Sequence, residues 1–221
     1  MNENSKKERV PIPKYTLGEE LISSISHGAG ALLGVAALIL CVIRAAKHGD
    51  TYAVVGGAVF GAALILLYAT STIYHALRPN LAKKVFRVLD HCMIYLLIAG
   101  SYTPITLVTL RPTVGWWLFG AIWAAAAVAI VFNAIDVEKF SVLSMICYIA
   151  MGWAVVVTFK PLVAAMPRAG VWLLVAGGIA YTVGAVIYGV GAKVKYMHSL
   201  WHFFVLAGSI FHFFCIYLYV M

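Results

Sequence analysis

Seven stretches of about twenty apolar residues follow one another along this 221-residue chain. A helix of about twenty residues crosses the hydrocarbon core of a bilayer, which is about 30 Å thick. Of all residues, 63% are hydrophobic and only 11% are charged, whereas about a quarter are charged in soluble domains. The chain is therefore predicted to be an integral membrane protein. Its first eighteen residues are polar, so no cleavable signal peptide is expected.

The connections between these stretches are short, so neighbouring helices are expected to be antiparallel. The sequence predicts an all-α membrane protein, a seven-transmembrane helix bundle over residues 19–221 that follows a polar cytoplasmic arm over residues 1–18. Pro104 is expected to kink the third span, and Gly28, Gly30 and Gly34 give the first span a small-residue face for close packing. The spans are expected at residues 22–43, 52–77, 85–110, 114–135, 140–159, 171–191 and 197–220.

Lysine and arginine are distributed unevenly between the two sides of the predicted bundle. Eleven lie on the side of the N-terminus and five on the other side. Positively charged loops favour the cytoplasm, so the N-terminus is predicted to be cytoplasmic and the C-terminus outside. The net charge of +8 is then a topology signal, and no nucleic-acid partner is predicted. Membrane lipids are the expected partners, and the sequence indicates no particular oligomeric state.

Polar residues from separate spans are expected at one depth, on the side of the N-terminus. His198 and His202 are four residues apart, so both imidazoles project from one face of a helix. His75 lies near the end of the second span with Ser71 one turn deeper, and Asp90 lies in the first turns of the third. Because ionisable groups inside a membrane are costly without partners, such a cluster indicates a functional site.

Zinc suits this set of side chains. Three neutral imidazoles from His75, His198 and His202, with a fourth position left to water, match a catalytic zinc site, where the pKa of the water falls towards about 7. Asp90 can hold that water or accept its proton, and Ser71 can donate a hydrogen bond to a substrate carbonyl or to the bound hydroxide. The alternative is that the histidines are interfacial and bind water or lipid headgroups. Residues assigned to supporting contacts or polar packing are Glu20, His27 and His91.

The order and spacing of four motifs resemble those of the hemolysin III family, the bacterial branch of the progestin and adipoQ receptor superfamily: Ser26-His27-Gly28, Ser71-x-x-x-His75, Leu89-Asp90-His91 and His198-x-x-x-His202. The resemblance covers nearly the whole chain. It implies zinc ligands at His75, His198 and His202, with Asp90 and Ser71 in the site. It also implies a multi-pass protein of the bacterial plasma (inner) membrane that acts in membrane-fluidity homeostasis. Related alkaline ceramidases imply hydrolysis of a lipid amide.

Three functions of different classes are therefore open. The first is a zinc-dependent, ceramidase-like membrane hydrolase that acts on a lipid amide. The second is a non-catalytic sensor of membrane fluidity, in which zinc only ties helices together. The third is a cytolysin that forms pores, as the family name says. A secreted pore former needs a soluble stage that hides its apolar helices, which makes the third function the least favoured on physical grounds.

Overall fold

The structure is a computed structural model that describes residues 12–191 and 194–221. In that part of the chain, seven helical segments are long and apolar enough to cross a membrane, and there is no strand. The predicted all-α fold with seven spans is therefore confirmed. Residues 1–11 of the predicted polar arm lie outside the described residues. The elements are α1 Leu17–His48, α2 Thr51–Ala76, α3 Leu81–Pro104, the π-helix η1 Ile105–Thr109, α4 Gly115–Ile135, α5 Ser141–Gly152, the 3₁₀-helix η2 Ala154–Thr158, α6 Phe159–Ala165, α7 Arg168–Val190 and α8 Met197–Tyr219.

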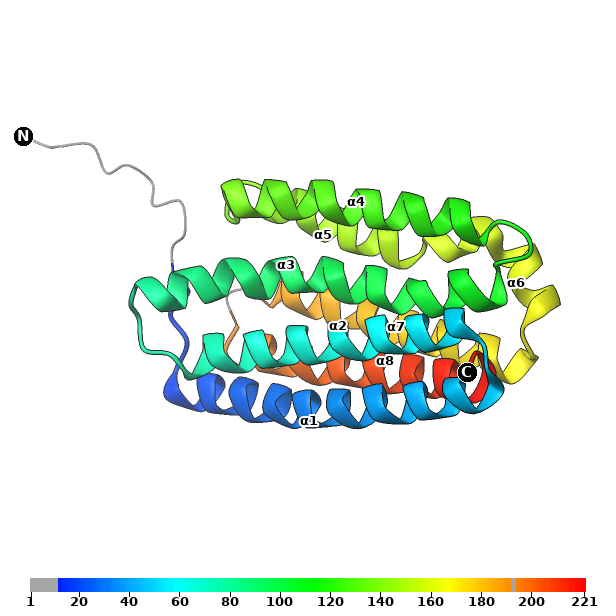
Figure 1. Cartoon of the computed structure of the whole chain (residues 1–221). Coiled ribbons are helices and arrows are strands. Elements are labelled where there is room, and N and C mark those ends of the chain that lie inside the picture. Colours follow the sequence, from blue (N-terminus) through cyan, green and yellow to red (C-terminus); the bar gives the residue numbers. More distant parts are fainter. Residues whose placement is uncertain (1–11, 192–193) are drawn as a thin grey trace, which may run out of the picture.

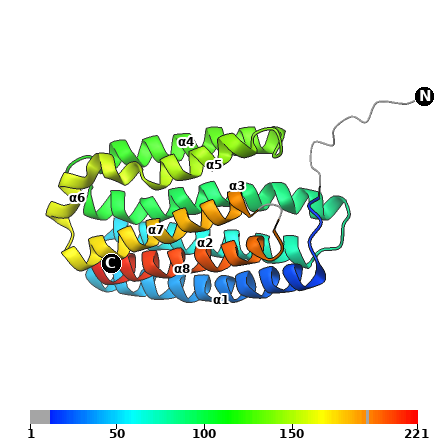
Figure 2. The ribbon, with the colours of Figure 1, turned by 180° about the vertical axis from the view of Figure 1, so that it is seen from behind.

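The helices form an elongated bundle in which α4 and α5 lie together on one side (Figure 1). Helices α1 and α8 lie on the opposite side, and α3 lies between the two groups (Figure 2). The start of α1 and the C-terminus lie at opposite ends of the bundle. Because α8 packs against α1 and α1 packs against α2, the first turns of α1 and α8 meet the last turn of α2.

Helix α1 begins at Leu17, earlier than the predicted start at residue 22, because the preceding residue caps it. Thr16 Oγ1 accepts a hydrogen bond from the Glu19 amide at 3.3 Å, and the Glu19 carboxylate accepts one from the Thr16 amide at 2.8 Å. This reciprocal pair satisfies N–H groups that a helix start leaves without partners. The cap fixes where the acidic first turn of α1 lies.

The small-residue face predicted for the first span does lie against α2. A Cβ atom added at Gly30 would lie 2.8 Å from the ring of Tyr68, and one at Gly34 would lie 3.1 Å from the backbone of Ile65. Both distances are too short for an ordinary contact, so side chains at these positions would force α1 away from α2. The two glycines let the helices approach closely.

Pro104, where the sequence predicts a kink, is the point at which the third span changes from α-helix to π-helix. It ends α3, and the span continues as the π-helix from Ile105 to Thr109. Proline has no backbone N–H and its ring crowds the turn before it. Widening the next turn accommodates both effects and carries the chain on to Thr109.

The fifth span is broken into α5, η2 and α6, whereas the sequence predicts one helix over residues 140–159. At the break, the hydroxyl of Tyr102 donates to the carbonyl oxygen of Gly152 at 3.0 Å and accepts from the amide of Val155 at 2.8 Å. Backbone groups inside a membrane must find partners within the protein. A side chain of α3 thus supplies the two bonds that the broken helix lacks.

Candidate metal centre

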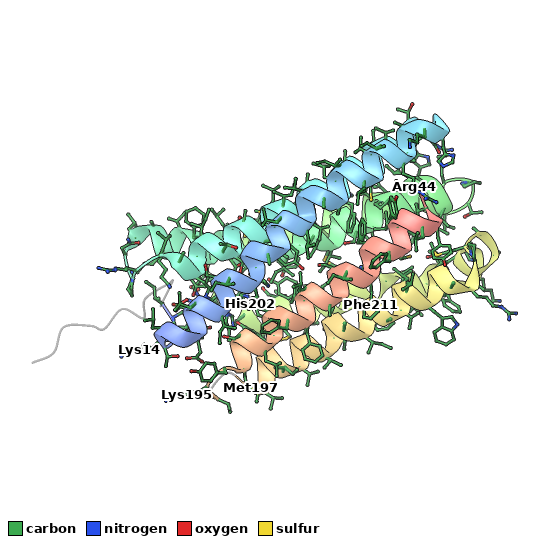
Figure 3. All side chains as sticks on the ribbon, turned by 90° about the horizontal axis from the view of Figure 1, so that it is seen from below. Lys14, Arg44, Lys195, Met197, His202 and Phe211 are labelled. Carbon is green, nitrogen blue, oxygen red and sulfur yellow. The ribbon has the colours of Figure 1, made fainter. Side chains whose placement is uncertain are left out.

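Three histidines converge where the end of α2 meets the start of α8. The Nε2 atom of His198 lies 3.3 Å from Nε2 of His75 and 3.1 Å from Nε2 of His202. All three ligand atoms lie within 4.8 Å of one another. Figure 3 shows His202 in the half of α8 nearer to Lys14 and Lys195, while Arg44 lies at the other end of the bundle. The structure thus brings together the three residues that the sequence singles out as metal ligands.

These nitrogen distances suit a shared cation better than a chain of hydrogen bonds. In a tetrahedral zinc site with Zn–N bonds of about 2.0–2.1 Å, the ligand nitrogens lie about 3.3 Å apart. Nε2 of His198 has one site for either a proton or a lone pair, so it cannot both donate to His75 and accept from His202. One of the two close pairs is then left without a full hydrogen bond. The donor set therefore fits a metal ion such as zinc.

Glu20 orients the first of these imidazoles. Its Oε2 atom lies 2.7 Å from Nδ1 of His75, and its Oε1 atom accepts from Nζ of Lys83 at 2.6 Å. A carboxylate that accepts from Nδ1 leaves Nε2 of His75 with its lone pair free for a metal. Lys83 is only 1% exposed and also donates to the carbonyl oxygen of Leu77 at 2.9 Å. The buried lysine balances the charge of Glu20 and fixes its position.

Asp90 and Ser71 lie beside the histidine cluster without belonging to it. Asp90, in α3, is 5% exposed and interacts electrostatically with His75. Ser71 lies in α2, one turn before His75, and is fully buried. Its Oγ atom lies near the Asp90 carboxylate but makes no hydrogen bond of ordinary geometry among the described residues. A buried hydroxyl without a partner costs free energy, so a bound ligand would be a favourable acceptor for it.

A cavity of about 140 Å³ lies beside this site, between α3, α5, α7 and α8, and none of the three clustered histidines lines it. Asp90, His27 and Trp201 line it near the histidines, and Tyr102 and His212 line it deeper in the membrane. A second cavity of about 80 Å³ shares Tyr102 and His212 and continues towards α6. The walls are mostly apolar, so the space suits a hydrocarbon chain better than water.

His27 and His91 have different surroundings. Both line the larger cavity, and neither belongs to the cluster of three histidines. The backbone carbonyl of His91 accepts from the hydroxyl of Tyr148 at 2.9 Å, which ties α3 to α5. The ring of His27 stacks on that of His202, with ring centroids 3.8 Å apart. His27 is thus in direct contact with one of the three imidazoles. The ring of His91 makes no such contact with the cluster in the described part of the chain.

Sequence reasoning missed two residues of the site. Tyr15, before α1, stacks on His198 with ring centroids 4.7 Å apart and an angle of 19° between the planes. Burial raises the pKa of the Tyr15 phenol, so it is neutral. Lys83 was counted only as a loop charge. Neither lies in a metal-binding motif, and the proximity of Lys83 to Glu20 would have required knowledge of how α1 packs on the α2–α3 connection.

Comparison with known proteins agrees with this geometry. A family model described as "Haemolysin-III related" matches residues 15–213. The chain is 45% identical to Hemolysin-3 of Bacillus cereus, over 92% of each chain. It is 40% identical to the Hemolysin-3 homolog of Bacillus subtilis (strain 168), over 93% of this chain and 96% of the relative.

More distant matches extend to animals. The chain is 27% identical to the human monocyte to macrophage differentiation factor, over 94% of this chain and 87% of the relative. That similarity fits the wider progestin and adipoQ receptor superfamily. No solved structure gives a significant match. The family model covers all seven spans, to the last turns of α8, and the two Bacillus relatives are 40–45% identical. This multi-pass membrane protein therefore belongs to the haemolysin III family.

Proposed function

We propose that the chain is a zinc-dependent hydrolase that cleaves a lipid amide within the membrane and thereby adjusts the properties of the bilayer. The supporting observation is the meeting of His75, His198 and His202 beside a buried acid, at one end of a mostly apolar cavity. Zinc held by three imidazoles with an open position is a Lewis acid that lowers the pKa of water, as hydrolysis at neutral pH requires.

The shape of the cavity supports a lipid substrate. Along α3 and its π-helical extension, the two adjoining cavities are lined from Asp90 to Ile105, roughly 22 Å at the helical rise of 1.5 Å per residue. An acyl chain placed there would bury its apolar surface, and its carbonyl end would reach the histidines. The polar head would face the side of the N-terminus. A substrate with one long chain and one hydrolysable bond at its end fits this arrangement.

The residues around the histidines can carry the chemistry of such a cleavage. Hydrolysis joins the oxygen of water to the acyl carbon and breaks the carbon–nitrogen bond. Asp90 takes the proton that the water loses and returns it to the departing amine, so that a fatty acid and an amine result. Ser71 donates its free hydroxyl to the carbonyl oxygen as negative charge develops there. Glu20 holds His75 in the tautomer that leaves Nε2 free.

A second function rests on the same histidines. They come from α2 and α8, so a metal bound only for structure would tie these helices together and make a fluidity sensor without catalysis. The names of the Bacillus relatives carry a third function, cytolysis. All seven spans of this chain are apolar enough to stay in a membrane, which gives a secreted pore former no soluble stage.

One substitution separates the enzyme from the sensor. Asp90→Asn keeps size and hydrogen bonding but removes the base, so zinc should stay bound while turnover falls on the order of 10²–10⁴-fold. The measurement combines zinc content of purified protein, bilayer fluidity and lipid analysis of cells that express wild type, Asp90→Asn or His202→Ala. Asp50→Asn, in the connection before α2 at the opposite end of α1, is the matched control and should behave as wild type.

A lipid change made by wild type and missing from a zinc-loaded Asp90→Asn protein is the expected result. If Asp90→Asn controls fluidity as well as wild type does, the hydrolase must be abandoned and the sensor kept. Release of contents from erythrocytes by purified wild type, unaffected by Asp90→Asn and His202→Ala, would instead favour the cytolysin.

A further inference from the structure

His27 is a buried histidine of α1 whose ring nitrogens have no hydrogen bond of ordinary geometry among the described residues. The side chain is 1% exposed, and neither Nδ1 nor Nε2 has such a partner among the described residues. By contrast, His75 uses both nitrogens, and His212, deeper in the membrane, has its Nε2 3.2 Å from the carbonyl oxygen of Leu174. A neutral imidazole carries one donor and one acceptor, and leaving both unpaired in an apolar interior is costly.

The position of His27 places it between the histidine cluster and the cavity. Its ring stacks on His202 at a centroid distance of 3.8 Å, with 30° between the planes, and meets the ring of Tyr68 edge to face at 4.9 Å. The same side chain lines the cavity, together with Asp90 and Trp201. A ligand whose reacting end lies at the histidines and whose chain fills the cavity would lie close to His27.

Two simpler roles do not account for this residue. As a fourth metal ligand, His27 would have to aim a nitrogen at the point where the other three converge. It is not among the residues whose ligand atoms meet there. As a packing residue only, it would be worse than phenylalanine, which stacks equally well without two unpaired polar atoms.

Ser71 offers a second unpaired polar group on the neighbouring helix. The next residue of α2, Thr72, lies against Gly28, the next residue of α1, because a Cβ added at Gly28 would lie 3.7 Å from the Thr72 side chain. His27 and Ser71 are therefore on adjoining turns of two closely packed helices. Both are buried, and neither makes a hydrogen bond of ordinary geometry among the described residues, although the Ser71 hydroxyl lies near the Asp90 carboxylate. Two free donors next to a hydrolytic centre are the arrangement that stabilises the oxygen of a carbonyl under attack.

We infer that His27 is the second hydrogen-bond donor, beside Ser71, to the acyl carbonyl oxygen of the lipid substrate. The inference rests on the proposed function and deepens it, because it requires a substrate with a carbonyl at the end of a long chain. The stacking face of the ring supports His202, while a ring nitrogen binds the ligand. These two roles are separable by substitution.

The test uses purified, zinc-loaded full-length protein and palmitic acid labelled with ¹³C at the carboxyl carbon. His27→Phe keeps the stacked ring and removes the nitrogens, so zinc content should equal that of wild type. Its affinity for palmitic acid should fall about tenfold, the size expected for one lost hydrogen bond to a charged or polarised oxygen. The shift of the bound carboxyl resonance seen with wild type should disappear. His27→Gln, which retains a donor, should restore part of the affinity and of the shift.

Turnover of a lipid amide provides a second readout, in which His27→Phe should lower kcat about 10²–10³-fold. Wild-type affinity and an unchanged carboxyl resonance in His27→Phe would overturn the inference, as would zinc loss in that variant, or failure of wild type to bind palmitic acid. If His27→Phe does not fold, His27→Leu compared with His27→Gln gives the same contrast. If wild type binds palmitic acid through His27 and yet forms no product, the hydrolase fails while the His27 contact stands.

Discussion

The phenol ring of Tyr15 lies almost parallel to the imidazole of His198, with ring centroids 4.7 Å apart. Tyr15 belongs to the short segment before α1, and its ring also contacts His75 at a centroid distance of 5.9 Å. It therefore covers the histidine cluster from the end of the bundle where α1 begins. A metal ion or chelator that approaches from this end meets Tyr15 first.

Removal of this cover should speed metal exchange. In Tyr15→Ala the histidines become accessible to solvent, so a chelator should strip zinc several-fold faster than from wild type. Tyr15→Phe keeps the ring and should lose zinc at the wild-type rate. The measurement is the time course of zinc transfer to a colorimetric chelator. Equal rates in all three proteins would show that metal exchange does not pass Tyr15.

Loss of the carboxylate on His75 should weaken metal binding. Glu20→Gln removes the charge that holds the Nδ1 proton, and changes to such supporting contacts typically cost 10–100-fold in metal affinity. Competition with a chelator of known affinity measures the effect. Asp50→Asn, which removes the half-buried ion pair with Arg111 at 3.2 Å at the far end of the bundle, is the control. An affinity unchanged by Glu20→Gln would mean that the carboxylate serves Lys83 rather than His75.

The break in the fifth span should depend on a single hydroxyl. Tyr102→Phe leaves the Gly152 carbonyl and the Val155 amide without their partner, which should cost about 1–3 kcal/mol of stability. Thermal unfolding in detergent reports this loss. Tyr52→Phe, at a ring that is 41% exposed, should leave the unfolding temperature unchanged. A Tyr102→Phe protein as stable as wild type would mean that the backbone repairs the break unaided.

Orientation in the membrane is predicted by the eleven-to-five distribution of lysine and arginine. A reporter that is active only outside the cytoplasm should work when fused after Met221 and fail when inserted between Arg78 and Lys84. Met221 follows the end of α8, and residues 78–80 lie between α2 and α3, so an insertion directly after Arg78 leaves the helices and the histidines intact. The reverse pattern would place the histidine cluster near the outer face.

The seven spans were predictable because the bilayer imposes one length on every apolar helix. Where the prediction failed, the cause was a contact between distant residues or local strain. The break after Gly152 is stabilised by Tyr102 from another helix, and the π-helix after Pro104 relieves crowding that a hydropathy pattern does not record. The observed start of α1 also differs from the predicted one, because Thr16 caps the helix before its apolar run begins.

The histidine cluster was predictable from depth and spacing. His198 and His202 share a helix face, and His75 lies near the end of a span on the same side of the membrane. Packing of these two helices at one depth therefore brings the three side chains near one another. The coverage by Tyr15 and the buried Lys83–Glu20 pair were not predictable, because tyrosine and lysine near a membrane surface are ordinarily solvated or interfacial. Only the packing of α1 against its neighbours shows their roles.

The three histidines come from α2 and from α8, the last helix of the chain. During synthesis, His75 is made early, and four further spans follow before the helix that carries its partners. A chain that stops short, or inserts with one span missing, brings the last helix to the wrong side and leaves the cluster incomplete. A metal ion that needs all three histidines would therefore bind only to a chain whose last helix has inserted in the correct orientation.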